Sequence, residues 1–164
     1  MTGDDPLVTG KIALAHLREF PDYYTRLGRM EEEARRVSVE QVKLDPDPYE
    51  PYLLSQALRA GDLLFVSGQT GIDENGELVA LDDFDAQAEQ TFRNLSRVLE
   101  AGGSSLSEVV KVTIFLTDMG NFDKIVELRR KWFTPPYPAD TIAEVRSLYR
   151  PEVEIEIEAI AVVS

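Results

Sequence analysis

Three glutamates near the end of the chain have a spacing that acid–base chemistry could use. Glu154, Glu156 and Glu158 alternate with aliphatic residues in a stretch typical of a β-strand. Alternate side chains of a strand lie on one face, roughly 6.5–7 Å apart, so two of them could work as a carboxylate pair or bind a metal ion. The same ladder could instead form cross-strand ion pairs with residues such as Lys111 or Arg146, and we favour the ion pairs.

The composition excludes several other catalytic centres. The chain has no cysteine, which removes thiolate catalysis and cysteine metal sites, and its single histidine cannot form a zinc site of several histidines. That histidine, His16, is either a metal ligand or proton carrier, or a partly exposed helix residue. The lack of a second ligand at metal spacing favours the helix residue. Since His16 belongs to the N-terminal part, Ser67 has no base for a serine hydrolase triad. No phosphate-binding loop or dinucleotide fingerprint is present, and we expect no cofactor and no metal.

The charge of the chain limits its partners. Its 164 residues include 30 acidic and 17 basic side chains, for a formal charge of −13. Nucleic-acid binding needs Lys and Arg to replace counterions, and anionic membranes repel such a protein, so we expect neither partner. No apolar run approaches the roughly 20 residues that span a bilayer, and residues 1–6 lack the pattern of a secretory signal. We therefore expect a soluble cytoplasmic protein.

The elements that must position these residues fall into two parts. In residues 1–50 we predict a helix over 8–19, a second over about 21–36, and a stiff, proline-rich spacer at 45–48. The rest of the chain instead alternates between strand and helix patterns. We therefore predict a helical N-terminal extension, 1–50, and a second domain, 51–164.

Turn signals and periodicity in the second part predict an α+β fold. Gly61-Asp62 marks a hairpin and Asn75-Gly76 a second turn. The pattern predicts helices over 83–101 and 121–133, and strands over 53–60, 63–67, 110–117, 142–148 and 153–163. The apolar stripe of the first helix is Phe84, Ala88, Phe92, Leu95 and Leu99, and a buried stripe of the second would be Phe122, Ile125, Val126 and Trp132. One face of the middle strand carries Val110, Val112, Ile114 and Leu116. Strands separated by helices favour a mixed sheet with both helices on one face.

The last predicted strand indicates an oligomer. Its opposite face changes along its length from the three glutamates to Ile160 and Val162, and neighbouring strands could add Phe115 and Ile142. A face that is half apolar and carries aromatics is typical of burial against another subunit, so we predict a homo-oligomer. The face expected to pack on the helices is aliphatic throughout: Val153, Ile155, Ile157, Ala159 and Ala161.

Four blocks of the second part resemble one family. They are Gly61–Gln69 (GDLLFVSGQ), Asn94–Gly103 (NLSRVLEAGG), Val109–Met119 (VVKVTIFLTDM) and Glu154–Val162 (EIEIEAIAV), in the family's order and spacing. The chain is thereby similar to the Rid family, also called YjgF or endoribonuclease L-PSP, over about residues 50–163. The resemblance implies a chorismate-mutase-like α+β fold, a homotrimer, and a small-molecule pocket at each of three subunit interfaces.

The resemblance also implies site residues. Archetypal members hydrolyse 2-imino acids or their enamine tautomers to 2-keto acids and ammonia, and an arginine binds the substrate carboxylate. Ser67 and Gly68 match the family's serine-glycine turn, and Glu156 matches a glutamate that helps to position water. Tyr52 matches the pocket tyrosine less closely, since two leucines intervene before Ser55. We therefore nominate Glu156 and Ser67 as catalytic residues, and Gly68 and Tyr52 as substrate-binding residues.

Three departures separate this chain from the family pattern. Asp140 stands where the family has its arginine, Ile142 replaces a neighbouring cysteine, and Val126 replaces an asparagine. A charge pair about 4 Å apart is worth roughly 4 kcal/mol at an effective dielectric of 20, and aspartate turns that attraction into repulsion. We therefore expect the substrate not to be a typical 2-imino carboxylate, and if Asp140 and Glu156 both line one pocket, we predict a neutral or cationic ligand such as an amine. The alternative is that Asp140 points to solvent or caps a loop.

Another arginine could replace the missing anchor. The candidates are Arg129, Arg146 and Arg150. Arg146 shares the predicted strand face of Ile142, so we expect it to pair with Glu156 or Glu158. The predicted substrate-binding set is Tyr52, Gly68, Asp140, Ile142, Val126, Phe115 and Arg146.

Three functions remain open. The first is hydrolysis of an imine, an enamine or a related C–N bond between subunits, with Glu156 and backbone groups orienting water. The second is a non-catalytic small-molecule sensor that uses the same pocket. The third, ribonuclease activity, is disfavoured by the charge of −13 and by the lack of a histidine pair.

Overall fold

The computed structural model describes residues 22–35 and 38–163, and the chain divides into two compact units, residues 1–37 and 38–164. In the first unit, helix α2 (Tyr23–Arg35) confirms the helix predicted over about 21–36. The carboxylate of Asp22 pairs with Arg26 one turn later, with 2.6 Å between Oδ2 and Nε. The helix predicted over 8–19, and His16 with it, lie outside the described residues.

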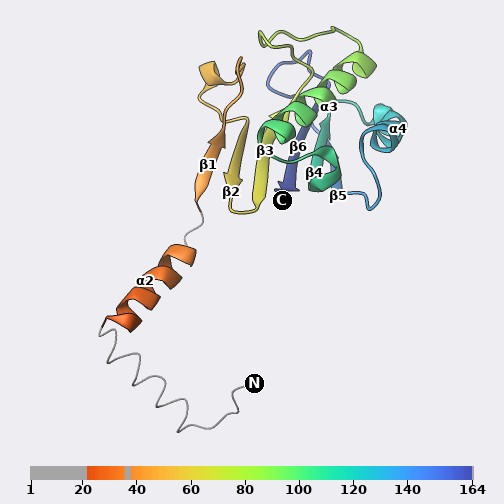
Figure 1. Ribbon diagram of the computed structural model, residues 1–164. Helices are drawn as coiled ribbons and strands as arrows, with labels where there is room; N and C mark the ends of the chain where they lie inside the picture. Colours follow the sequence, from red (N-terminus) through yellow and green to blue (C-terminus); the bar gives the residue numbers. More distant parts are fainter. Residues whose placement is uncertain (1–21, 36–37, 164) are drawn as a thin grey trace. The chain divides into compact units, whose positions relative to one another are not determined.

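The second unit is built on one six-stranded sheet with the order β1-β2-β3-β6-β4-β5 (Figure 1). Strands β4 and β5 are parallel, and every other neighbouring pair is antiparallel. A parallel pair needs a crossover connection, which here contains a helix. The predicted mixed sheet is therefore confirmed. The strands are β1 (Val39–Val42), β2 (Ala57–Ala60), β3 (Leu63–Gln69), β4 (Val109–Leu116), β5 (Ala139–Glu144) and β6 (Ile155–Val162).

The sheet unit begins earlier than the boundary expected at 50/51. Strand β1 pairs with β2 from Val39↔Ala60 to Val42↔Ala57, so the residues from 38 onward belong to the sheet. Only Val42 of this strand is buried, and no apolar alternation marks it in the sequence. The expected spacer at 45–48 is tied down as well. Oδ1 of Asp47 accepts hydrogen bonds from the Tyr49 backbone N–H at 2.9 Å and from Gln56 Nε2 at 2.7 Å.

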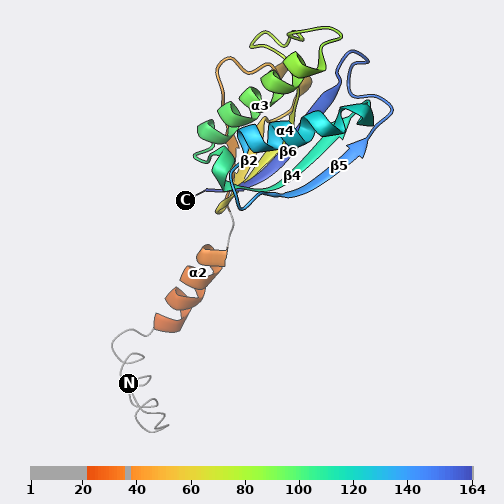
Figure 2. The ribbon, with the colours of Figure 1, turned by 90° about the vertical axis from the view of Figure 1, so that its right-hand side faces the viewer.

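Helices α3 (Phe84–Ala101) and α4 (Phe122–Trp132) cover one face of the sheet, as predicted (Figure 2). The side chain of Asp83 caps the start of α3 by accepting from the Ala86 N–H at 3.0 Å. The core lies between these helices and the sheet, and the ring of Phe92 stacks on Trp132 with centroids 5.6 Å apart. In the described part of the chain, no helix is both long and apolar enough to cross a membrane.

The predicted apolar stripes of α3 and α4 are buried to different extents. All five stripe residues of α3 are buried, which confirms that prediction. In α4 only Ile125 is buried, and Phe122 is 40% exposed. Helix α4 packs near β5 at the edge of the sheet, where fewer neighbours are available to cover its flanks.

Two details of the strands correct the sequence prediction. A register shift between Val109 and Lys111 puts Val109 on the buried face and leaves Val110 46% exposed, so the strict alternation predicted from Val110 is wrong at its first residue. Strand β5 runs over 139–144 instead of 142–148, because its parallel ladder ends with Leu116↔Glu144 at the end of β4. Arg146 therefore lies beyond the strand.

The face of the sheet away from α3 and α4 carries an apolar patch. Leu58 of β2, Phe65 of β3 and Ile160 of β6 are registered side by side, and the first two are 39% and 43% exposed. The predicted alternation of β6 is confirmed, since Ile155, Ile157, Ala159 and Ala161 are buried on the helix side. Within the described part of this unit, neither α3 nor α4 covers the opposite face, which we call the open face (Figure 2).

Candidate functional site

A hollow of about 200 Å³, which we call the Glu156 pocket, joins residues from well-separated segments. The short helical turn η1 (Glu50–Tyr52) and its flanks supply two tyrosines, β3 supplies Gly68, and β6 supplies Glu156. The lining is Pro48, Tyr49, Tyr52, Leu54, Gly68, Thr70, Ile72, Gly76, Tyr149 and Glu156. Three predicted site residues thus meet here: Tyr52, Gly68 and Glu156.

The carboxyl group of Glu156 has a shifted pKa, as is common for side chains that transfer protons. Burial raises its pKa above the ordinary range, and the charge of Glu158 raises it further. Gly68 is the neighbour that leaves room for it, because a Cβ at position 68 would overlap the Glu156 carboxylate. A glycine is thus required here by close approach rather than by backbone conformation.

Tyr49 is a pocket residue that sequence reasoning missed. Its hydroxyl donates a hydrogen bond to the carbonyl oxygen of Gly68 at 2.6 Å, and the side chain is 9% exposed. Burial, followed by the charge of Glu156, raises its pKa well above the ordinary value, which keeps the hydroxyl protonated and donating. The nominated Tyr52 is 59% exposed and lies at the mouth. A second tyrosine between prolines, in Pro48-Tyr49-Glu50-Pro51, was the available signal.

Two further pocket residues, Thr70 and Tyr149, also escaped the sequence analysis. The guanidinium of Arg150 lies over the ring of Tyr149, 5.4 Å from its centroid, in a cation–π contact. A hydrogen bond with Tyr52 raises the pKa of Arg150. Arg150, one of the three candidate anchors, therefore contacts two tyrosines of the Glu156 pocket.

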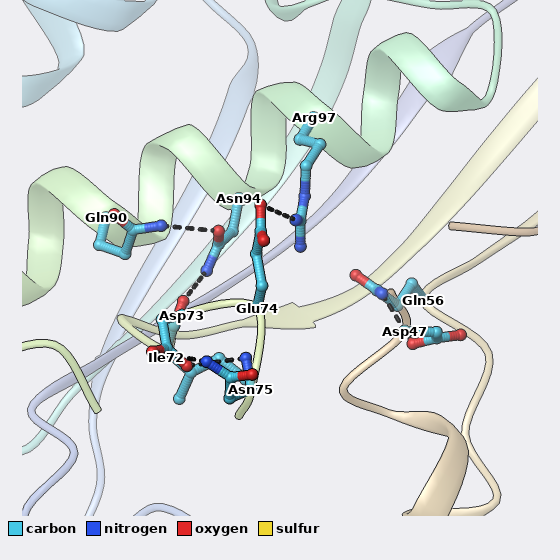
Figure 3. A network of polar contacts seen from close by, with 9 residues as sticks. All are labelled: Asp47, Gln56, Ile72, Asp73, Glu74, Asn75, Gln90, Asn94 and Arg97. Atoms are coloured by element: carbon cyan, nitrogen blue, oxygen red, sulfur yellow. Dashed lines mark hydrogen bonds and ion pairs between the residues drawn. The ribbon is translucent and has the colours of Figure 1, made fainter. Parts of the chain in front are cut away.

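The loop that forms one wall of this pocket is fastened to helix α3 (Figure 3). Nδ2 of the buried Asn94 donates to the carbonyl oxygens of Thr70 at 2.9 Å and Ile72 at 2.8 Å. Gln90 in turn donates to Oδ1 of Asn94 at 3.0 Å. Buried backbone carbonyls need such partners, so Asn94 holds the loop in one conformation.

Gln87 fastens the segment that leads into β6. Its Nε2 donates to the carbonyl oxygens of Ala80 at 2.9 Å and Glu152 at 3.0 Å, and its Oε1 accepts from the Glu154 N–H at 2.9 Å. The side chain is fully buried. Gln87 therefore fixes the backbone two residues before Glu156.

A second hollow, which we call the Asp140 pocket, has a volume of about 410 Å³. Nε of Arg129, on α4, donates to Oδ2 of Asp140, on β5, at 2.6 Å. The two side chains are 23% and 19% exposed, and the guanidinium lies 6.0 Å from the Phe122 ring centroid. Asp140 therefore neither points freely to solvent nor caps a loop. The lining is Phe122, Arg129, Phe133, Tyr137, Pro138, Asp140 and Ile142.

Within one chain, the two pockets lie on opposite faces of the sheet. Asp140 is registered with Val112, which is buried against the helices, so Asp140 shares the helix side. Glu156 alternates with Ile155 and Ile157, which face the helices, and so lies on the open face. The possibility that Asp140 and Glu156 line one pocket is therefore not met inside a single chain.

The remaining nominated residues are spread around these pockets. Phe115 is registered beside Glu156 on the open face. The Ser67 hydroxyl donates to the Ser55 carbonyl at 2.7 Å, and Ser67 borders a depression of about 600 Å³ on that face. Ile142 lines the Asp140 pocket, and Val126 is half-buried on α4.

The ion pairs expected of the glutamate ladder are absent among the described residues. No salt bridge joins Glu154, Glu156 or Glu158 to Lys111 or Arg146. Lys111 instead donates to the Val112 carbonyl at 2.6 Å and to the Thr141 hydroxyl at 3.1 Å. Arg146 lies beyond β5 and cannot face the ladder from it. Over the described ranges, no cluster of three or more His, Asp or Glu side chains could hold a metal ion.

Most of the chain is similar to known proteins. Residues 42–163 match the family described as endoribonuclease L-PSP, and residues 1–33 match a family of proteins of unknown function, DUF5661. A RutC family protein of Pyrococcus horikoshii is 45% identical over 117 residues, which cover 71% of this chain and 90% of that protein.

Two further relatives carry more specific names. The 2-iminobutanoate/2-iminopropanoate deaminase of Dermatophagoides farinae is 34% identical over 120 residues, which cover 73% of this chain and 91% of that one. The crystal structure of RidA from an Antarctic Psychrobacter superposes with a TM-score of 0.70 and 35% identity, covering 76% of this chain and 99% of that one.

Proposed function

The chain belongs to the endoribonuclease L-PSP family, also called the Rid or YjgF family, and we propose that it hydrolyses the C–N bond of a small imine or enamine. The family match over residues 42–163 and the relatives described above confirm the resemblance and the α+β fold predicted from four sequence blocks. Among those relatives, the Dermatophagoides protein is named as a deaminase.

The observation that carries the proposal is the protonatable carboxyl group of Glu156 in a small pocket. Imine hydrolysis adds the oxygen of water to the imine carbon, while a proton goes to the nitrogen. The C–N bond then breaks and leaves a carbonyl compound and ammonia. A side chain with a raised pKa can, as the carboxylate, take a proton from the attacking water and then, as the carboxylic acid, return it to the nitrogen.

We further propose that a second copy of the chain completes the site in a homotrimer. The Glu156 pocket and the Asp140 pocket lie on opposite faces of one sheet, so both can border one ligand only if they come from different subunits. The apolar patch of Leu58, Phe65 and Ile160 supports such an assembly, since a contiguous exposed patch of this kind is typical of an interface.

A non-catalytic small-molecule sensor is the second candidate. The observation that favours it is the contact between Asp140 and Arg129. The resemblance places a carboxylate-binding arginine at position 140, where this chain has an aspartate that is already paired. A protein that had lost its substrate anchor would keep the pocket and bind a different ligand without turning it over. Ribonuclease activity is disfavoured by the formal charge of −13.

Ammonia release from freshly generated imines tests the proposal. We expect imines to release ammonia faster in the presence of the wild-type protein than in buffer alone. Glu156→Gln should reduce the protein-catalysed rate roughly 10²–10⁴-fold, as removal of a general acid–base residue does. The matched control is Glu127→Gln, an exposed glutamate on α4, which should leave the rate unchanged.

Two outcomes separate the candidates. A wild-type protein that accelerates no imine, yet binds a small molecule tightly, would favour the sensor. A Glu156→Gln variant with full activity would remove Glu156 from the mechanism even if the enzyme hypothesis survived.

A further inference from the structure

The charged groups of the Asp140 pocket cancel each other. Arg129 and Asp140 are in contact at 2.6 Å and are both mostly covered, so the pocket carries one positive and one negative group at nearly the same place. Phe122, Phe133 and Tyr137 contribute aromatic walls. The pocket is thus apolar around a single ion pair of zero net charge.

The ion pair leaves hydrogen-bonding groups free on both partners. A guanidinium has five N–H donors, and the contacts of the described residues use only Nε of Arg129. The contact likewise uses only Oδ2 of Asp140 and leaves Oδ1 as an acceptor. The pocket therefore offers an N–H donor and a carboxylate acceptor side by side.

Resting on the proposed function, we propose that the Asp140 pocket selects a neutral ligand with adjacent C=O and N–H groups, such as a carboxamide or a lactam, over a carboxylate. Arg129 donates to the ligand carbonyl, and Asp140 accepts from the ligand N–H. A ligand carboxylate would meet attraction from Arg129 and repulsion from Asp140 at similar distances, and would lose its hydration without compensation. Asp140 is thus the specificity-determining residue.

A matched pair of probes, pyruvamide and pyruvate, tests this selection. The two molecules have nearly the same shape and differ in charge. Calorimetric or NMR titration of the full-length wild-type protein should show pyruvamide binding roughly threefold or more tightly than pyruvate. In Asp140→Asn the freed guanidinium should shift the ratio of the two affinities toward pyruvate by roughly tenfold or more.

Two further variants keep the test interpretable. Asp123→Asn, at an exposed aspartate in the first turn of α4, should leave the ratio as in the wild type. Asp140→Ser removes the same charge with a different side chain and should shift the ratio in the same direction, which guards against a folding defect specific to one variant.

Other results would overturn the inference. Tighter binding of pyruvate to the wild type, with a ratio that Asp140→Asn does not change, would mean that the ligand displaces Asp140 from Arg129. Failure of both probes to bind either protein would also overturn it. Ammonia release from imines is measured separately, so a failed selection and a failed enzyme proposal remain distinguishable.

Discussion

The two pockets of the sheet unit hold their carboxylates by different means. In the Glu156 pocket, room left by Gly68 and loops fastened by Asn94 and Gln87 define where the carboxyl group can lie. In the Asp140 pocket, a single charged neighbour, Arg129, holds the carboxylate. The first arrangement depends on the shape of the backbone, and the second depends on one ion pair.

This difference separates two kinds of sensitivity. A site defined by close packing fails when any supporting atom is moved, because interiors have little spare room. A site defined by one partly covered ion pair can change its preference through one substitution, at small cost in stability. Four substitutions, two at residues that support the Glu156 carboxyl group and one at each carboxylate, test this distinction.

Gly68→Ala should have the largest effect, on activity rather than on stability. The new Cβ would overlap the end of the Glu156 side chain, which can swing away, so the carboxyl group moves out of place while the fold persists. We expect roughly a hundredfold loss of ammonia release, with a loss below about 1 kcal/mol in the free energy of unfolding.

The control is Gly28→Ala in α2, where a Cβ meets no neighbouring atom within 4 Å. It should leave the rate unchanged. Full activity in Gly68→Ala would show that the position of the Glu156 carboxyl group does not matter.

Asn94→Ala should lower the free energy of unfolding by about 2–3 kcal/mol, because it leaves two buried carbonyl oxygens, those of Thr70 and Ile72, without their donor. Urea unfolding measures the effect. Gln90→Ala removes only the hydrogen bond to Oδ1 of Asn94 and should cost less than half as much. Equal losses in the two variants would contradict a special role for the loop carbonyls.

Asp140→Asn should cost only about 0.5–1 kcal/mol in the free energy of unfolding, since the ion pair is partly exposed and screened by solvent. The loss should shrink in 1 M salt. Asp85→Asn, which breaks the more exposed pair with Lys124, is the control and should have an effect near zero. A loss of several kcal/mol at position 140 would mean that Asp140 supports the fold as well as the pocket.

Apart from the loss of rate expected above, Glu156→Gln should produce the smallest change in stability, and that change lies in its pH dependence. The pKa of Glu156 is higher in the folded protein than in the unfolded chain, so the folded state binds more protons between the two pKa values. The folded protein therefore loses stability as the pH rises from the unfolded pKa through the folded pKa. Removing the group should flatten that decline and leave the variant slightly more stable at neutral pH. Thermal unfolding from pH 4 to 8 measures the slope, and a steeper decline in the variant would contradict the direction of the shift.

Local patterns predicted most of the sheet unit. The stripe of α3, the hairpin at Gly61-Asp62 and the alternation of β6 all follow from side-chain periods of 3.6 and 2 and from turn chemistry. Strand β1 and the bulge at Val110 were not predicted, because neither one shows a distinctive pattern of apolar residues in the sequence. The end of β5 was predicted too late in the sequence, because its hydrogen-bonded ladder stops at Glu144, opposite the last residue of β4.

The candidate site was predictable in part. Gly68 and Glu156 came from sequence blocks and Tyr52 from a looser match to the family pattern, and the structure brings all three together in one pocket. Tyr49 had only its place between two prolines as a sequence signal and Tyr149 had none, and the folded chain brings both into the pocket beside Glu156. The ion pairs expected for the glutamate ladder were wrong, because Lys111 is bound to neighbouring hydroxyl and carbonyl groups and Arg146 lies beyond its strand.

The family and the alternation of strands and helices could be inferred from the residues alone, and the resemblance predicts that Asp140 stands where the family has an arginine. Each of these depends on residue identity or on short-range periodicity. The pairing of Arg129 with Asp140, and the position of Asp140 and Glu156 on opposite faces of the sheet, appear only in the folded chain. Those facts depend on the parallel register of β4 and β5 and on the packing of α4, which are set by contacts between distant segments.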